Sequence, residues 1–561
     1  MGESSTMRLT PRTRAQGPES VLIIGGGATG LVTLRNLSEE RAHDDAGSYA
    51  IFDAMLVERR DDVGGVWYWS DETYALERAV GADKVQGLSP LFDPRGQPHW
   101  PSPAYLNLRG NVLPEFLEFS GQKFEPPANG ETFPSLAETH EYLRSFAKPY
   151  RSRIRCGVEV LRVQQLAQDA GWKVTLKHWT SGLTAPEAVS FTPRVEERTF
   201  DRVVVAAGWY DTPYYPDAPG LQEARKAGHI HHCKHYRDSI AYRGKKVVVV
   251  GNNNSANEVA AHLAPLNSVD HPVYRSAKTA PVDKCPSLPD ERIKDVGMIS
   301  TYKLIPAATS ERATQLELTL VDGSTISGVD YVVLGTGYGQ KYPWLHVLTD
   351  QARAGGTGEV ELLTPDSLRA VRVPRMYNHA LYAPSPRLTL AFVGLVISTM
   401  PFSFNDLISA WITAVWAGKI AVPSSTHDRL HDERARLDWM YARAVARNPH
   451  ADRNDPTIYA GYHLLGGSLK DGPPSELHFA AELYGQLEKA DPDRTRMWSW
   501  RWDRQREDRQ TQMYVRKRQW LEHNAQRIRN DPFDLLGANN KYADLVPLLV
   551  HPDWQPKSAR L

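Results

Sequence analysis

The chain contains 561 residues, more than one hydrophobic core can organise, so we expect two or three domains. Its 66 lysines and arginines balance its 66 aspartates and glutamates, and this zero net charge argues against a general affinity for nucleic acid or an anionic membrane. No apolar run approaches the roughly 18 residues of a membrane span, and the N-terminus is polar. The composition therefore predicts a soluble, cytoplasmic protein with a disordered lead-in over residues 1–19.

The three cysteines, Cys156, Cys233 and Cys285, are far apart in the sequence. They form no CxxC pair, so they predict neither a disulfide framework, nor a zinc site or other metal site, nor a redox-active dithiol. This usage fits a reducing compartment such as the cytosol.

A glycine-rich motif follows the first apolar segment. Four β-favouring residues, VLII, run into Gly25, Gly27 and Gly30, and an apolar pattern with helical periodicity continues beyond them. In this spacing the first glycine permits a tight turn, the second lets a pyrophosphate approach the backbone, and the third lets helix and strand pack closely. The pattern predicts a strand, a turn and a helix that bind a dinucleotide phosphate at Ala28 and Thr29, with an ordinary strand-to-helix turn as the alternative.

The next apolar run, residues 54–57, ends in Glu58, and Arg59 follows. A carboxylate at the end of this second strand can accept hydrogen bonds from both ribose hydroxyls and would repel a 2′-phosphate. The first site therefore suits FAD or NAD and not NADP. Because Glu58 lies further from Gly30 than usual, we interpret the polar residues 38–49 as a loop insertion.

Close backbone approach to a ligand is also predicted after Glu58. Gly65 and Val66 belong to a Gly-Gly-Val-Trp sequence, and Trp67 could form the wall of a site for a flat ring, with a core tryptophan as the alternative. Residues 113–119 resemble a short helix. Ser135, with a glutamate three residues later, predicts the capped start of another helix.

Two alternating segments between residues 156 and 177, VEVLRV and WKVTLK, predict an antiparallel hairpin that contains Val160. A buried strand is expected at residues 202–208, and the prolines that follow indicate a crossing to another domain.

The opening pattern returns at Val247, where VVVVGNNNSANEVAAHLA repeats the strand, turn and helix. This copy keeps Gly251 but has Asn253 and Ala256 at the positions of the other two glycines. Its second strand ends in Arg275, and a cation at that place would accept a 2′-phosphate. The second site therefore suits NADPH.

The remaining segments complete the predicted organisation. Residues 316–320 with Asp322-Gly323 predict a hairpin, and residues 331–338 predict a buried strand that resembles the strand at 203–208, so we expect the two to flank an inserted domain. Apolar residues 388–396 predict a strand, residues 406–420 an amphipathic helix, and the run from Trp498 to Asn530 a long amphipathic helix. Basic and aromatic runs can bind nucleic acid, but the interspersed acids favour packing.

The predicted fold class is α/β, with two Rossmann-like dinucleotide-binding domains and a helical C-terminal extension. We assign residues 20–210 and 328–445 to an FAD-binding domain, residues 211–327 to an NADPH-binding domain, and residues 446–561 to the extension. FAD and NADPH sites in one chain imply hydride transfer from nicotinamide to flavin. Because a disulfide reductase needs a redox-active cysteine pair, oxygen is the expected acceptor.

Together these residues resemble the flavin-containing monooxygenase family of class B flavoprotein monooxygenases, over about residues 21–425. Gly228 to Tyr236 match the family's G-x-x-x-H-x-x-x-Y fingerprint, and Asp330 with residues 334–338 resembles its return strand. Lys226 replaces the Phe that usually precedes the fingerprint. The resemblance implies a set of cofactor-binding residues: Gly25, Gly27, Ala28, Thr29, Gly30, Glu58, Arg59, Gly65, Val66, Trp67, Asn107, Val160, Gly251, Asn253, Asn254, Ser255, Ala256, Arg275, Gly337 and Tyr338.

The resemblance also implies a reaction. NADPH reduces the flavin, oxygen adds to it, and retained NADP⁺ shields a flavin hydroperoxide until substrate arrives. Three residues are the catalytic candidates. Asn111, which follows Gly110 and not the more usual Thr or Ser, resembles the family's active-site asparagine but could be a loop-capping residue. His232 and Tyr236 could contact NADP⁺ or serve as structural residues in the linker.

The predicted function is monooxygenation of a soft nucleophile, by N-hydroxylation of an amine, which could be an amino acid, or by S-oxygenation. The expected partners are a small-molecule substrate and O₂, with no nucleic acid and no membrane, and the oligomeric state stays open. Baeyer-Villiger oxygenation of a ketone is the alternative, although that branch generally ends the fingerprint in Trp-Pro and here Arg237 follows Tyr236. A further alternative is a nucleotide-responsive flavoprotein without turnover, because the Gly251 loop is degenerate.

Overall fold

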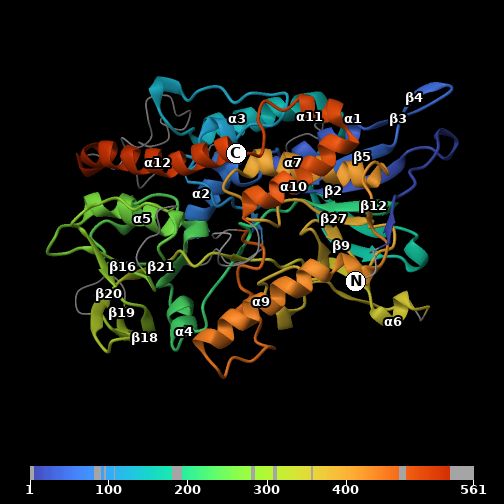
Figure 1. Cartoon of the computed structure of the whole chain (residues 1–561). Helices are drawn as coiled ribbons and strands as arrows, with labels where there is room; N and C mark the ends of the chain where they lie inside the picture. Colours follow the sequence, from blue (N-terminus) through green and yellow to red (C-terminus); the bar gives the residue numbers. More distant parts are fainter. Residues whose placement is uncertain are drawn as a thin grey trace.

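The computed structural model describes residues 5–80, 90–93, 96–105, 108–179, 193–279, 285–307, 313–355, 358–465 and 475–530. Figure 1 shows two β-sheet regions side by side, with helices above the first and the last long helix, α12 (Arg504–Asn530), above the second. The mixed α/β class expected from the sequence is confirmed.

The first region is built on a seven-stranded sheet in the order β25-β26-β27-β12-β2-β5-β8, in which β27 to β8 run parallel. Alternate residues of β2 face opposite ways: Val21 and Ile23 pack under the helices, whereas Leu22 and Ile24 pack on a second sheet, β11-β10-β9-β23-β24. The sheet is therefore buried on both faces. The elements of this region are β2 (Glu19–Ile24), α1 (Ala28–Glu39), β3 (Arg41–Asp44), β4 (Gly47–Ala50), β5 (Phe52–Glu58), α2 (Asp71–Val80), β6 (Leu91–Phe92), β7 (Pro98–His99), α3 (Leu136–Ala147), β8 (Ile154–Cys156), β9 (Val158–Gln165), β10 (Trp172–His178), β11 (Arg194–Phe200), β12 (Arg202–Val205), β23 (Leu345–Leu348), α6 (Asp350–Arg353), β24 (Val360–Leu362), β25 (Met376–Tyr377), β26 (Leu381–Tyr382), β27 (Leu390–Phe392) and α7 (Pro401–Trp416).

The second region repeats this plan around a five-stranded parallel sheet, β14-β21-β15-β16-β17. Val247 and Val249 of β15 pack on the α5 side, and Val248 packs on the three-stranded antiparallel sheet β18-β19-β20. Its elements are α4 (Leu221–Lys226), β14 (Ile230–His232), β15 (Val247–Val250), α5 (Asn254–Leu263), β16 (Val273–Ser276), β17 (Ile293–Val296), β18 (Ile299–Pro306), β19 (Thr314–Leu320), β20 (Thr325–Val329) and β21 (Tyr331–Leu334).

Several local predictions are confirmed. Ser135 caps α3, and Glu138 completes the capping box by accepting the Ser135 N–H at 2.7 Å. The hairpins predicted from alternation are β9 with β10 and β19 with β20. The short helix expected at residues 113–119 is a single turn, Pro114–Phe116.

Other expectations are wrong. The strand at 331–334 does not return to the first sheet, because β21 lies between β14 and β15 in the second. The chain crosses between regions at a two-stranded pair, β13 (Thr212–Pro213) with β22 (Tyr338–Gly339). The loop insertion expected at 38–49 contains the hairpin of β3 and β4, since its polar residues alternate around a Gly47 turn.

Both ends of the first region also differ from expectation. The lead-in is ordered from Ser5, because β1 (Thr6–Met7) pairs with β28 (Val422–Pro423) and Arg12 forms an ion pair with Asp201. Helix α7 is not amphipathic: residues 402–416 are all buried, since α1 and the later helix α10 (Glu476–Ala490) cover it.

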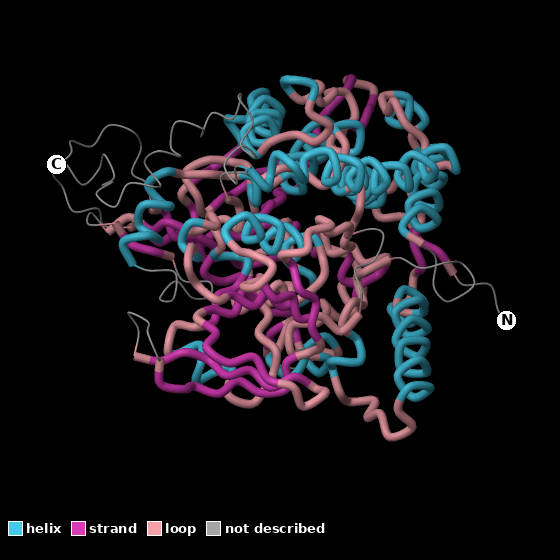
Figure 2. Tube along the Cα trace, turned by 90° about the vertical axis from the view of Figure 1, so that its left-hand side faces the viewer, coloured by secondary structure: helices cyan, strands magenta, loops and turns pink. Residues whose placement is uncertain are grey.

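The C-terminal segment is helical and wraps the first region. Figure 2 shows α9 as a helix standing at one edge of the molecule, beside the turn of the chain that follows it. In the described part of the chain, no helix combines the length and apolar character needed to cross a membrane. The helices are α8 (Thr426–Arg429), α9 (His431–Arg447), α10 (Glu476–Ala490), α11 (Pro492–Arg496) and α12 (Arg504–Asn530).

Candidate active site

The first glycine loop connects β2 to α1 with no room for side chains. A Cβ at Gly25, whose φ is +114°, would lie 2.5 Å from the Ala206 carbonyl oxygen, and one at Gly30 would lie 1.9 Å from the Gly25 oxygen. Gly27 is the N-cap of α1, and no side chain among the described residues caps this end. The first-turn N–H groups, including those of Ala28 and Thr29, are therefore available to a phosphate.

Glu58 ends β5 and lies against this loop. Its carboxylate accepts the Gly26 N–H at 2.7 Å and the Arg60 N–H at 2.9 Å, and the residue is 5% exposed. A fixed acid beside the glycine loop is placed to accept further hydrogen bonds from ribose hydroxyls. The side chain of Arg59 extends elsewhere, to Asp211 at 2.7 Å.

The Gly-Gly-Val-Trp turn lies directly on the same loop. The Gly64 N–H donates to the Gly26 carbonyl oxygen at 2.9 Å, and a Cβ at Gly65 would come within 2.8 Å of the Gly27 Cα. Ser102 fixes the turn by donating to the Val66 carbonyl oxygen at 2.7 Å. Trp67 is half-buried and packs on the main core, and its role as the wall of a ring site stays a prediction.

Asn111 supplies a buried acceptor. Its Oδ1 is buried and has no hydrogen-bond partner among the described residues. An unpaired buried amide oxygen costs about 1–3 kcal/mol, so a ligand that donates an N–H or O–H here would be favoured. Flavin and nicotinamide both carry amide donors, and the residues present therefore fit either ring. Asn107 lies outside the described residues.

The second glycine loop connects β15 to α5 with a different distribution of small residues. Gly251 has a φ of +120°, and a Cβ on it would lie 2.7 Å from the Gly335 carbonyl oxygen. A Cβ on Gly335 would in turn lie 2.7 Å from the Ala256 Cβ. Asn253 is the N-cap of α5 without a side-chain cap bond, which leaves the first turn, with Asn254 and Ser255, open to an anion.

Arg275 is the next-to-last residue of β16, near the strand end as expected, but its guanidinium is already engaged. It forms two hydrogen bonds to the carboxylate of Asp295, at 2.7 and 2.8 Å, and donates to Asn257 at 3.0 Å and to Ser287. The residue is only 5% exposed. This geometry describes a structural ion pair, and not an open cation waiting for a 2′-phosphate.

His232 ties the fingerprint to the second crossing. Its Nδ1 accepts the Lys234 N–H at 3.0 Å, so Nε2 carries the proton and donates to the Gly337 carbonyl oxygen at 3.0 Å. Burial, with the nearby His235, lowers the pKa of His232 to about 3. The ring also makes an edge contact with Tyr338.

Tyr236 ends the fingerprint inside the second core. It is 1% exposed, and its hydroxyl is 3.1 Å from Nδ1 of His262. The next residue, Arg237, forms two hydrogen bonds to Glu77 of α2, at 2.7 and 2.6 Å. The fingerprint is thereby fixed to the first region.

No sequence motif predicts two further contacts between the regions. Lys234 and Arg59 both pair with Asp211; burial opposes ionisation of Asp211, yet the two cations hold its pKa below its usual range. Burial lowers the pKa of Lys234 to about 8. Ordinary charged residues separated by many positions carry no pairing pattern.

Val160, in β9, packs at the edge of the second hydrophobic cluster of the first region.

Helix α12 reaches both regions, which no motif predicted. Arg506 donates to Ser403 of α7 at 2.7 Å, and Lys517 lies 3.6 Å from Glu258 of α5. Leu521 packs with Ala261 of the same helix. The extension is therefore part of the framework around the site.

Two family models match the chain. One, described as FAD-NAD(P)-binding, covers residues 22–209, and the other, described as pyridine nucleotide-disulphide oxidoreductase, covers residues 117–362. All three cysteines of this chain are free, so the dithiol chemistry in the second description has no counterpart here.

Curated relatives cover most of the chain. Flavin-containing monooxygenase ustF2 of Aspergillus flavus is 26% identical over 73% of this chain and 84% of its own length. Thiol-specific monooxygenase of Saccharomyces cerevisiae is 24% identical over 72% of this chain and 78% of its own. These names favour an enzyme over a flavoprotein without turnover.

A solved structure shares the fold. The S-allyl-L-cysteine S-oxygenase from Allium sativum aligns with a TM-score of 0.56 at 22% identity, over 90% of this chain and 99% of that one.

Proposed function

Since this chain belongs to the flavin-containing monooxygenase family and uses FAD and NADPH, we propose that it inserts one oxygen atom of O₂ into a soft nucleophile. The nucleophile is an amine nitrogen, which can belong to an amino acid, or a sulfide sulfur. When bound, the two cofactors supply the electrons and activate the oxygen: two electrons from NADPH reduce O₂, one oxygen atom enters the substrate and the other leaves as water. The residues of the chain bind, orient and exclude solvent.

We assign FAD to the first glycine loop and NADPH to the second. The uncapped N-terminus of α1 would hold the FAD pyrophosphate, and Glu58 would hold its ribose. The uncapped N-terminus of α5 would hold the NADPH pyrophosphate. The strand pairing supports two Rossmann-like domains whose boundaries lie at the β13-β22 crossing, with the C-terminal extension covering both.

Among the three catalytic candidates we retain Asn111. The observation that carries this assignment is its buried Oδ1, which has no hydrogen-bond partner among the described residues. A neutral amide accepts from one ring and donates to an oxygen species without adding charge.

We assign positioning roles to His232 and Tyr236. The two ring nitrogens of His232 are both used within the protein, and the hydroxyl of Tyr236 is in the core, so neither side chain has a free polar atom for substrate. We expect both side chains to affect the reaction indirectly, because they hold Gly337 and the second region in position.

Heteroatom oxygenation is favoured over ketone oxygenation. Arg237, where the ketone branch generally has Trp-Pro, forms a buried ion pair with Glu77. Among the relatives, the yeast protein is named for thiols, so sulfur compounds are among the first substrates to test.

Product analysis tests this function. The purified yellow protein would be incubated with NADPH and O₂ and matched sets of sulfides, thiols, primary amines, amino acids and ketones. We expect NADPH consumption and a product heavier by one oxygen for a sulfur or nitrogen compound. An ester from a ketone, with no heteroatom product, would replace this proposal by Baeyer-Villiger oxygenation.

A further inference from the structure

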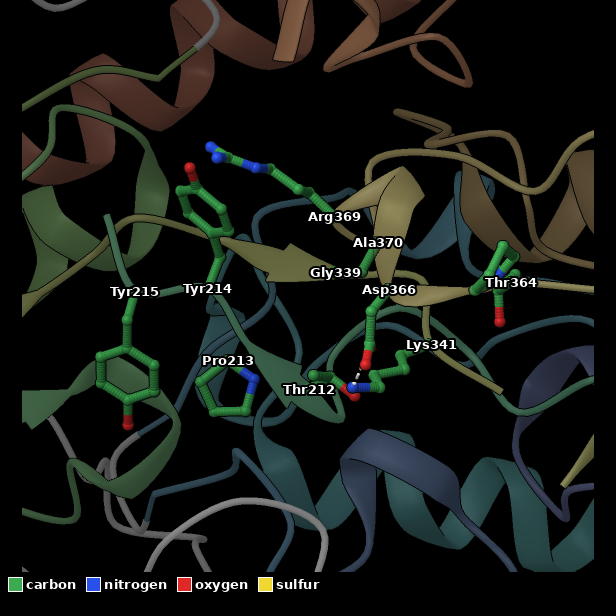
Figure 3. Close-up of a pocket in the computed structure, with 11 residues that line it drawn as sticks. Thr212, Pro213, Tyr214, Tyr215, Gly339, Lys341, Thr364, Asp366, Arg369 and Ala370 are labelled. Carbon is green, nitrogen blue, oxygen red and sulfur yellow. Dashed lines mark hydrogen bonds and ion pairs between the residues drawn. The ribbon is translucent and has the colours of Figure 1, made fainter. Parts of the chain in front are cut away.

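The two regions are joined by backbone pairing at the crossings and by side chains of α12. At the crossings β13 pairs with β22, and a cavity of about 190 Å³ lies beside them (Figure 3). Lys341 and Asp366 on its wall pair with each other at 2.7 Å, so these two charges are already compensated. The contacts of α12 extend further, to the loop that carries Asn111.

Backbone carbonyl groups hold one side of the Asn111 loop, residues 108–111. The Gly110 N–H donates to the Pro134 carbonyl oxygen at 2.8 Å, and the Arg109 guanidinium donates to the Phe133 carbonyl oxygen at 3.0 Å. These bonds fix the loop against the segment that precedes α3. Two carboxylates then connect the loop and the residue before it to α12.

Glu258 of α5 forms the first of these bridges. Its Oε2 accepts the Tyr105 hydroxyl at 2.6 Å, and its Oε1 lies 3.6 Å from Nζ of Lys517. Tyr105 and Lys517 are only 8% and 4% exposed, so water competes little for either contact. Burial lowers the pKa of Lys517, whereas Glu258 favours its charged form. The buried ammonium group therefore depends on Glu258 for charge compensation.

Glu131 forms a second bridge with the same arrangement. Its Oε2 accepts the indole N–H of Trp520 at 3.1 Å, and its Oε1 lies 3.7 Å from Nη2 of Arg109. Both ends of the ion pair are mostly buried. Burial lowers the pKa of Lys517 and the Arg109 charge lowers it further, so the two bridges are close to each other in space.

Lys517 and Trp520 are three residues apart in α12 and therefore lie on one face of the helix. Phe133 contacts both of them. Its ring centroid is 6.3 Å from that of Trp520 and 4.9 Å from Nζ of Lys517. This face of α12 thus packs on the same segment that holds the Asn111 loop.

We propose that α12 is a positioning element for Asn111. Lys517 acts through Glu258, and Trp520 acts through Glu131. Each carboxylate uses one oxygen for α12 and the other for the loop or the residue before it, so the helix restrains the loop at two points. A functional side chain on a loop needs such support, because its geometry is otherwise less precise than on a helix or strand. The proposal rests on the role assigned to Asn111 in the proposed function.

Hydrogen exchange of the protein as purified tests the contacts. Lys517→Met removes the ammonium group, and Trp520→Phe removes the indole N–H but keeps an aromatic ring on Phe133. In the double variant we expect the amides of residues 108–111 to exchange at least about fivefold faster, since a loop with fewer contacts opens more often. The amides of β2 and α1 are the internal reference and should be unchanged. Arg516→Met, on the exposed side of α12, is the matched control and should leave the loop unchanged.

The effect on the reaction has its own measurement. In the double variant the ratio of hydrogen peroxide to oxygenated product should rise at least about fivefold, because Asn111 is held less well. If the effect passes through Asn111, adding Lys517→Met to Asn111→Leu should lower the coupling no further.

Three results overturn the proposal. The first is unchanged exchange of residues 108–111 in the double variant, and the second is an equal rise throughout the protein, which means a general loss of stability. The third is a further fall in coupling when Lys517→Met is added to Asn111→Leu. The exchange experiment contains neither NADPH nor substrate, so it decides whether α12 holds the loop even if product analysis shows another reaction.

Discussion

The two strand-turn-helix units of this protein solve the same packing problem with glycines in different places. In the first unit a Cβ at Gly30, in the helix, would lie 1.9 Å from the Gly25 carbonyl oxygen, so this position must be glycine. In the second unit Ala256 lies in the helix, and the residue without a side chain that faces it is Gly335, where a Cβ would lie 2.7 Å from the Ala256 Cβ. A glycine pattern searched in one segment alone therefore understates the likeness of the second unit to the first.

The units also differ at the end of the second strand. Glu58 is turned toward its own glycine loop and binds a loop N–H, whereas Arg275 is turned toward the next strand and binds Asp295. We therefore assign the acid to the proposed FAD site and the cation to the scaffold. This contrast is open to test by substitution.

The largest effect should come from substituting Gly30 in the first unit, compared with Ala256 at the matching position of the second. In Gly30→Ala the new Cβ would lie 1.9 Å from the Gly25 carbonyl oxygen, so α1 must move and FAD should be lost completely. Ala256→Gly removes a methyl group and should cost only about 1 kcal/mol of stability through helix propensity. Flavin absorbance per mole of purified protein measures the first effect and thermal unfolding the second. Retention of FAD by Gly30→Ala would show that FAD binding does not require glycine at this position.

Reversing the charge at Glu58 should have the next largest effect. Glu58→Arg removes the acceptor that binds the loop N–H and places a cation beside the FAD ribose. Charge-assisted hydrogen bonds contribute about 1.5–3 kcal/mol, so FAD affinity should fall about tenfold to a hundredfold. Dialysis followed by flavin quantification measures it. A variant that stays fully yellow would remove Glu58 from the FAD site.

The counterpart in the second unit should behave differently. Arg275→Ala leaves Asp295 and Asn257 without their partner and should lower the free energy of unfolding by about 1–3 kcal/mol. Since the guanidinium is engaged within the protein, the Michaelis constants for NADPH and NADH should change by the same factor. A selective rise for NADPH alone would restore the 2′-phosphate role that the sequence indicated.

Asn111 has an unpartnered buried atom and should therefore affect the oxygenation more than His232 and Tyr236, whose polar atoms are paired within the protein. Asn111→Leu should keep FAD but lose about 1–3 kcal/mol of stabilisation of the oxygenating state, so NADPH would be consumed while hydrogen peroxide replaces product. Peroxide and product are quantified together in one assay. Unchanged coupling would return Asn111 to a loop-capping role.

His232 should affect stability through pH instead. Its native pKa, about 3, is below the ordinary 6.5, so the unfolded chain binds a proton first as pH falls. Stability from this group is complete above pH 6.5 and declines by about 1.4 kcal/mol per pH unit below it, until the native residue titrates. The melting temperature of His232→Gln should fall less between pH 7 and pH 5 than that of the unaltered protein. The exposed His450→Gln is the control, and equal slopes for all three proteins would contradict the assignment.

Local sequence patterns predicted most of the helices and strands. Contacts between distant segments decide which sheet each strand joins, and these were not predicted. The Ser135 capping box and the β19-β20 hairpin depend on neighbours in the sequence, and both were predicted correctly. The likeness of strands β12 and β21 was also real, but its meaning was misread: they occupy the same place in two different sheets. Sheet membership depends on pairing across more than a hundred residues, which periodicity does not encode.

The same division holds for the candidate site: its local features could be predicted from the sequence, and its long-range contacts could not. Glycines with a required conformation are visible in the sequence, so the two loops could be placed. The pairs Arg237–Glu77 and Lys517–Glu258 could not, because each joins ordinary charged residues from distant segments. Helix α7 was misjudged because its outer face is covered by α10, a later part of the chain.

The contacts of α12 imply an order of events during synthesis. Each region can pair its strands as soon as it has left the ribosome, since β2 to β27 and β14 to β21 precede the last helix in the chain. Arg506 and Lys517 emerge only afterwards, and until then Ser403 and Glu258 lack these partners. We therefore expect the newborn protein to pass through a stage in which both regions are formed but not yet joined by α12, and translation of α12 to end that stage.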